Sequence, residues 1–237
     1  MTLQTLPHHL HGFSQSFNQS PLRHLGTRYS ADGVFLEEPG NTIVCHLESG
    51  SMSAQAVIGA RARMQSLPEA DKLAFTAESS LHMTLFQGII EYRRKLPFWP
   101  EDVALDTPID EMTEIFLNRL EGFEAPDSFK VEVIGATPNG LSVDGLTNAD
   151  RKAMKVWRDR LADVFGYRHP DHDSYGFHIT FAYVVARFSD EAMFAWHKGL
   201  VEILEDLQEA APIIELEPPA FCSFVDMNHF ERLKVLA

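Results

Sequence analysis

The chain has 237 residues, 45% of them hydrophobic, and its 20 Lys and Arg against 34 Asp and Glu give a net charge of −14. This composition is typical of a folded globular protein and excludes both a disordered chain and a broad DNA-binding surface, which needs an excess of cations. No apolar run approaches the roughly 18 residues of a membrane span, and the N-terminus does not resemble a secretory signal. Two cysteines cannot form a disulfide framework. We therefore predict a cytoplasmic protein without a membrane partner.

The first half of the chain alternates between turn signals and apolar runs. Residues 1–40 are irregular in pattern and predict an arm that precedes a single domain over residues 41–237. Helical spacing and runs of β-forming residues mark the elements that follow. In chain order these are a strand over 42–48, a helix over 55–67 capped by Ser51 or Ser53, a strand over 80–90, a basic and aromatic loop over 91–102 and a helix over 109–123.

The second half repeats this order of elements. An Asn-Gly turn at Asn139 and Gly140 separates two alternating runs, which is a strong hairpin signal. The predicted elements are strands over 129–136 and 141–146, a helix over 148–166 capped by Thr147 or Asn148, a strand over 176–185, a helix over 190–210 and short strands near 213–217, 221–226 and 231–236.

Strand, helix and strand therefore occur twice, and each unit ends in a strand that carries a His-x-Thr-hydrophobic tetrapeptide. The two tetrapeptides are His82-Met83-Thr84-Leu85 and His178-Ile179-Thr180-Phe181. We predict an α+β fold with two pseudo-repeated lobes, whose antiparallel sheets are flanked by helices and face a central cleft. A single His-x-Thr would carry little weight in a chain with 11 histidines, but a matched pair in matched strands favours a functional role.

The period of two residues in a strand places each histidine and its threonine on the same face. His82 and Thr84 should point one way while Leu81, Met83 and Leu85 point into the core. In the second strand, the residues expected on the core face opposite His178 and Thr180 are Phe177, Ile179, Phe181 and Tyr183. Two imidazoles can act as a base and an acid near neutral pH, and two hydroxyls can donate to phosphoryl oxygens, which is suitable equipment for cleaving a phosphodiester.

These duplicated strands resemble the two-histidine (2H) phosphoesterase superfamily, which includes cyclic nucleotide phosphodiesterases and bacterial 2′–5′ RNA ligase-like proteins. The resemblance covers roughly residues 40–236 and suggests a bacterial branch of unassigned substrate. It implies that His82 and His178 are the acid/base pair, that Thr84 and Thr180 bind phosphate, and that neither a metal nor another cofactor is needed. The expected substrate is a small phosphoester or nucleotide, with an RNA end as an alternative, acted on by a monomer.

Three further residues are candidates for substrate binding. Arg93, or its neighbour Arg94, could bind a second phosphate, and Tyr92 or Phe98 could stack on a base. Tyr175 could line the cleft. A solvated loop and a packing role are the structural alternatives for these residues.

Two other functions remain open from the sequence. One is a non-catalytic module that binds a nucleotide or an RNA end. The other is a metal-dependent hydrolase built from His169, His172 and the neighbouring carboxylates Asp171 and Asp173, for which a solvated loop is the favoured interpretation.

Overall fold

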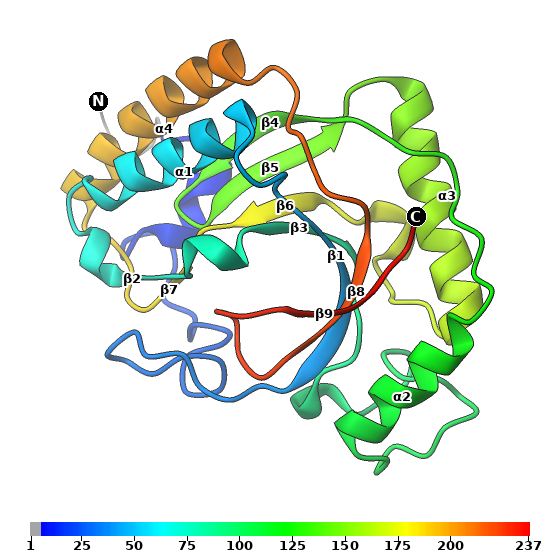
Figure 1. Cartoon of the computed structure of the whole chain (residues 1–237). Coiled ribbons are helices and arrows are strands. Elements are labelled where there is room, and N and C mark those ends of the chain that lie inside the picture. The colour runs from blue at the N-terminus through cyan, green and yellow to red at the C-terminus, as the bar shows by residue number, and fades with distance from the viewer. Residues whose placement is uncertain (1–5) are drawn as a thin grey trace.

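The computed structural model describes residues 6–237 and has a seven-stranded sheet at its centre (Figure 1). All neighbouring strands of this sheet are antiparallel. Their order across the sheet is β4 (Val131–Thr137), β5 (Gly140–Gly145), β6 (Phe177–Thr180), β3 (His82–Phe86), β1 (Gly40–His46), β8 (Ala220–Phe224) and β9 (Glu231–Val235). A separate two-stranded sheet pairs β2 (Leu73–Phe75) with β7 (Ala182–Val184).

In the described part of the chain, four α-helices flank the large sheet in two groups (Figure 1). One group contains α1 (Met52–Gln65) and α4 (Asp190–Ala210), which pack against each other, and the other contains α2 (Ile109–Arg119) and α3 (Asn148–Phe165). The short 3-10 helices are η2 (His8–Phe13), η3 (Ala70–Lys72), η4 (Glu78–Ser80), η5 (Glu91–Arg93) and η6 (His172–Ser174). Across residues 6–237, none of the helices is both long enough and apolar enough to cross a membrane.

The predicted α+β class is confirmed, and local capping explains why the helices were predictable. The Ser51 side chain accepts from the amide of Ala54 at the start of α1, and Thr147 forms a capping box with Asp150 at the start of α3. The two predicted sets of strands meet edge to edge, because β3 pairs with β6 through Met83 and Ile179. The two halves therefore share one continuous sheet, and their two histidine strands are neighbours.

The strand predicted over 176–185 is wrong as a single element. It consists of β6 and β7, which belong to different sheets, and the main chain changes direction at Phe181. The amides of Phe181 and Ala182 both donate to the carbonyl of Asn139 there, instead of continuing the ladder with β5. This break shifts the alternation, so Tyr183 lines a cleft beside Thr180 and does not share the core face of Ile179 as predicted.

Other strand boundaries also differ from the predictions. The strand expected over 80–90 is confined to β3, since η4 precedes it and the chain leaves the sheet after Phe86. Residues 213–217 form only isolated bridges, from Ile214 to Val131 and from Leu216 to Leu47. The short strand β2 was not predicted, because three residues are too few to show a period.

One face of the sheet carries the main hydrophobic core. Met83, Leu85 and Ile179 point into it and are completely buried, together with aromatic and aliphatic residues of α2 and α3. Full burial of such a side chain contributes about 1.5–3 kcal/mol, so the register of β3 and β6 is strongly constrained. A one-residue slip would exchange the two faces and expose these residues. The packing of the core therefore determines that the polar residues of β3 and β6 face the other way.

The arm packs against the body of the protein. Leu10 and Tyr29 are buried, and the side chains of Ser14 and Ser16 both donate to Asp190 at the start of α4. At its other end the amide of Glu38 donates to the carbonyl of Val225, which follows β8. Between these two anchors, Arg23 and Arg28 of the arm line a hollow together with residues of β5 and β6.

Candidate active site

The pairing of β3 with β6 brings the two His-x-Thr motifs together. With Met83 opposite Ile179, the antiparallel register sets His82 across from Thr180 and Thr84 across from His178. All four side chains line one cleft on the face opposite the main core. His82 and His178 are diagonal neighbours in this register, and such residues lie about 7–8 Å apart in an antiparallel pair. The two histidines therefore lie on either side of a space that can accommodate a phosphoryl group.

His82 is the more enclosed of the two histidines. Its Nδ1 lies 2.6 Å from the carbonyl oxygen of Ser80, and its ring meets the ring of Phe230 edge-on at 4.2 Å. Burial lowers the pKa of His82 to about 3, an effect that the nearby His46 and His178 reinforce and the hydrogen bond to Ser80 opposes. The ring is therefore neutral at neutral pH, with its proton on Nδ1 and the lone pair on Nε2, because a carbonyl can only accept.

His178 is exposed at the mouth of the cleft and makes the corresponding contact. Its Nδ1 lies 3.1 Å from the carbonyl oxygen of Gly176, two residues earlier in the chain. The ring of Tyr175 lies 6.0 Å away between centroids. Since Nδ1 is held by the main chain, Nε2 is the nitrogen of His178 that can meet a ligand in the cleft.

The cleft has a volume of about 160 Å³, and polar groups converge in it. Thr84 and Thr180 are the other pair of diagonal neighbours in this register, so each threonine is adjacent to both histidines. The side chain of Tyr175 also lines the cleft, near the Thr84 side chain. A larger hollow of about 1320 Å³ opens beside the cleft and shares part of its wall. A phosphoryl group fits the small cleft, and the rest of a ligand would extend into the hollow.

Of the three other predicted binding residues, the structure brings two into the cleft. Tyr175 and Arg93 line both the cleft and the hollow. Tyr92 is exposed, donates to the carbonyl of Glu37 and lines only the hollow. Arg94 is held by Glu91 and by main-chain carbonyls of the following loop, which leaves Arg93 as the cation of this loop that faces the cleft.

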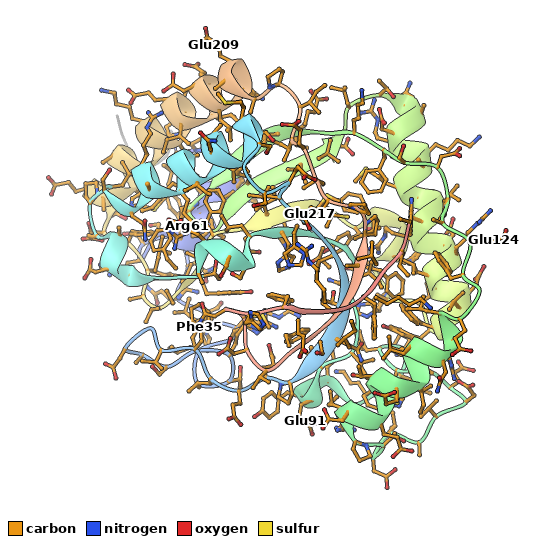
Figure 2. The ribbon with its side chains drawn as sticks, in the orientation of Figure 1. Phe35, Arg61, Glu91, Glu124, Glu209 and Glu217 are labelled. Atoms are coloured by element: carbon orange, nitrogen blue, oxygen red, sulfur yellow. The ribbon has the colours of Figure 1, made fainter. Side chains whose placement is uncertain are left out.

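The sequence interpretation missed several residues of the cleft wall, of which Arg28 is the most informative. Arg28 comes from the arm, and its Nε donates to the buried carboxylate of Glu38 at 2.5 Å. Its guanidinium lies 5.3 Å from the centroid of the Tyr183 ring. Phe35, labelled in Figure 2, also lies on the arm and meets Tyr183 edge-on at 5.9 Å. These contacts join segments far apart in the sequence, so no local pattern could have revealed them.

The residues proposed for a metal site lie elsewhere. Within residues 6–237, the one group of three potential metal ligands consists of Asp159, His172 and Asp173. Asp159 accepts from His172 at 2.9 Å and from Arg168 at 2.8 Å, and Asp173 accepts from Lys155 at 2.8 Å. The group is thus already compensated by two cations, and none of its members lines the cleft or the hollow.

Two of the comparisons with known proteins found a match. The family model 2H-phosphodiest, described as "Domain of unknown function (DUF1868)", matches residues 28–142, a range that includes His82 and ends before His178. A solved structure, that of the conserved protein of unknown function ATU0111 from Agrobacterium tumefaciens str. C58, is 50% identical, covers 98% of this chain and 100% of its own, and superposes with a TM-score of 0.96. No protein with curated annotation matches the chain. The chain belongs to the 2H phosphoesterase family.

Proposed function

We propose that the protein is a metal-independent phosphoesterase that hydrolyses a cyclic phosphodiester of a small nucleotide. The observation that carries this proposal is the pairing of β3 with β6, which sets two imidazoles and two threonine hydroxyls around one cleft. General acid–base cleavage of a phosphodiester needs one group that accepts a proton and one that donates a proton. The threonine hydroxyls supply donors for the non-bridging oxygens.

The electrostatic difference between the histidines supports different roles for them. Burial keeps His82 neutral, so its Nε2 can accept a proton from water. His178 is exposed at the mouth of the cleft, where its Nε2 is open to solvent and to a ligand, and we assign it the role of the acid. A bound phosphodiester is an anion and raises the pKa of the His82 ring, which strengthens His82 as a base.

The chemical step then follows from the position of the two rings. Nε2 of His82 removes a proton from a water molecule as its oxygen forms a bond to phosphorus. The bond between phosphorus and one ester oxygen breaks, and that oxygen takes the proton from Nε2 of His178. The product is a phosphomonoester with a free hydroxyl, and exchange of protons with solvent restores both rings. Run backwards, the same steps would join a phosphomonoester to a hydroxyl, so reversible ligation is compatible with the site.

The dimensions of the cleft favour a small substrate. A volume of about 160 Å³ takes the cyclic phosphate and part of a ribose, while the adjoining hollow takes a base or further groups. The net charge of −14 disfavours long RNA, because the protein surface as a whole would repel its backbone. A short RNA end is the alternative that these dimensions allow.

A panel of phosphoesters tests the proposal. We expect turnover of at least one cyclic phosphodiester among 2′,3′-cyclic nucleotides, 3′,5′-cyclic nucleotides, a cyclic phosphate of ADP-ribose and short oligoribonucleotides that end in a cyclic phosphate. Release of the monoester would be followed by phosphorus NMR. Stabilisation by these ligands with no turnover of any of them would contradict hydrolysis and indicate a binding module.

A further inference from the structure

The larger hollow beside the cleft has an unusual charge. Among the residues that the structure describes, four cations line it, and they come from both the arm and the loop after β3. Two of its acidic neighbours are Glu38, which is bonded to Arg28, and Asp144. The cations are Arg23, Arg28, Arg93 and Lys95.

Three of these cations are not neutralised by a carboxylate. Among the described residues, 6–237, no ion pair joins Arg23, Arg93 or Lys95 to an acidic side chain. In a chain in which 34 acidic residues face 20 basic ones, a local excess of cations around a hollow is a marked departure from the average. Such a concentration focuses a positive potential where a ligand would enter.

Two of these cations, Arg28 and Arg93, are held in place by neighbouring groups, whereas Arg23 and Lys95 are exposed. The guanidinium of Arg93 lies 4.7 Å from the centroid of the Phe98 ring and donates to the carbonyl of Gly88, while its buried Nε has no partner. The guanidinium of Arg28 is held by Glu38. A turn of the arm, in which the amide of Arg28 donates to the carbonyl of His24, brings Arg23 to the same hollow.

The positive groups also act on one another. Burial, and then Arg28, Arg23 and Arg93, lower the pKa of His24 to about 4. Burial lowers the pKa of Arg93, and Arg28 and Arg23 contribute in the same direction. An anion in the hollow would relieve this repulsion, and a guanidinium fork is well suited to phosphate oxygens.

We propose that Arg23 of the arm and Arg93 form a second anion site, which binds a phosphate of the substrate other than the one that reacts. The substrate class is then a nucleotide cyclic phosphate that carries a further phosphate or diphosphate at its 5′ side. This inference rests on the proposed function, since it assumes that the cyclic phosphate lies between His82 and His178. The arm thereby becomes a part of the binding site that selects the substrate.

The test compares two esters that differ only at the second phosphate. These are adenosine 2′,3′-cyclic phosphate and its 5′-phosphorylated counterpart. We expect the wild-type kcat/KM to be about 10–100-fold higher for the phosphorylated ester, which is the effect of one charge-assisted hydrogen-bonding pair. Arg23→Gln should bring the ratio of the two values close to one. Arg160→Gln removes an exposed arginine of α3 that lines neither the cleft nor the hollow, and it should leave the ratio at its wild-type value.

A binding measurement separates failure of this inference from failure of the proposed function. Calorimetry on a His82→Asn/His178→Asn double variant compares adenosine 3′,5′-bisphosphate with adenosine 3′-monophosphate. A tighter Kd for the bisphosphate that Arg23→Gln abolishes would support the second site even if no ester is turned over. Equal Kd values, or a preference that survives Arg23→Gln, would overturn it. Tighter binding of an oligoribonucleotide than of the bisphosphate would overturn the small-substrate class.

Discussion

His82 and His178 lie on different strands and are held in the same way: each ring donates Nδ1–H to the main-chain carbonyl two residues earlier in the chain. The acceptors are Ser80 at 2.6 Å and Gly176 at 3.1 Å. A main-chain acceptor cannot rotate away, so it fixes both the ring orientation and the tautomer. Both Nε2 atoms are consequently available to the cleft, as an acid/base pair requires. The two His-x-Thr motifs therefore share this main-chain contact as well as their residue types.

Replacing the threonines should weaken phosphate binding more than it slows chemistry. Thr84→Val and Thr180→Val keep the shape of the side chain and remove the hydroxyl donor. We expect each to lower kcat/KM by about 10–100-fold, mostly through KM, since a hydrogen bond to a charged group contributes about 1.5–3 kcal/mol. Thr84→Ser and Thr180→Ser restore the donor and should stay within a few-fold of wild type. Equal losses for the serine and valine variants would indicate a packing role.

Tyr175 connects the cleft to a buried arginine. The guanidinium of Arg158 is buried, donates to the carbonyl of Leu85 at 2.7 Å and lies 4.2 Å from the centroid of the Tyr175 ring. Burial raises the pKa of Tyr175, so the hydroxyl beside Thr84 stays protonated. Tyr175→Phe keeps the ring and removes this hydroxyl. We expect KM to rise about fivefold with kcat nearly unchanged, because the loss of one hydrogen bond to the substrate costs about 1 kcal/mol of binding free energy. An unaltered KM would remove the hydroxyl from the account of substrate binding.

Activity should be independent of added or removed divalent metal. The cleft presents imidazoles, hydroxyls and guanidinium groups, and Asp159, His172 and Asp173 lie outside it in ion pairs. Hydrolysis should therefore persist in excess EDTA and in Asp159→Asn. Rates with and without EDTA, together with elemental analysis of the purified protein, check this prediction. Loss of activity with EDTA and its recovery with zinc would instead support a metal-dependent hydrolase.

Buried histidines make the stability of the protein sensitive to acid. Burial lowers the pKa of His169 to about 3, and Arg93, Arg158 and His172 act in the same direction. In the unfolded chain this ring titrates near 6.5. Below that pH the unfolded state binds the proton and the folded state does not. As far as His169 is concerned, the free energy of unfolding is therefore highest above pH 6.5 and decreases as the pH falls toward about 3.

The variant His169→Phe tests this linkage. The ring lies among Phe86, Phe98 and Tyr167, and its buried Nε2 makes no hydrogen bond, so phenylalanine suits the environment. Urea unfolding at pH 7.5 and pH 5 should show a smaller loss of stability in the variant than in wild type. The difference per pH unit is at most about 1.4 kcal/mol for one histidine. The exposed His9, replaced by Asn, provides a control, and a loss identical to wild type in His169→Phe would contradict the prediction.

The helices and the paired motifs could be predicted because their signals are local. Capping residues and helical spacing define α3 and α4 almost to the residue, and alternation correctly placed His82, Thr84, His178 and Thr180 on a face away from Met83 and Ile179. The ends of strands were less predictable, because a continuous apolar run does not show where a chain leaves its sheet. The chain leaves the large sheet at Phe181, and the predicted side-chain direction of Tyr183 was wrong for that reason.

The remainder of the cleft depends on long-range contacts. Arg28 and Phe230 both line the cleft, the first held by Glu38 and Tyr183 and the second packed on His82. Neither residue lies in a pattern that distinguishes it from a surface loop. Gly140 shows the same limit: its φ of 141° and the 2.1 Å that would separate an added Cβ from the carbonyl oxygen of Ile179 make glycine necessary, but only once β5 lies against β6.

The most direct test of the central claim is the kcat of His82→Asn and His178→Asn on the cyclic phosphodiester that the wild-type protein hydrolyses best. Asparagine cannot exchange a proton near neutral pH, so each variant should lose more than about 10²-fold in kcat while circular dichroism and the melting temperature show that it folds. His9→Asn, at an exposed position on η2, should match wild type. Full activity in either His82→Asn or His178→Asn would contradict an acid/base pair in this cleft.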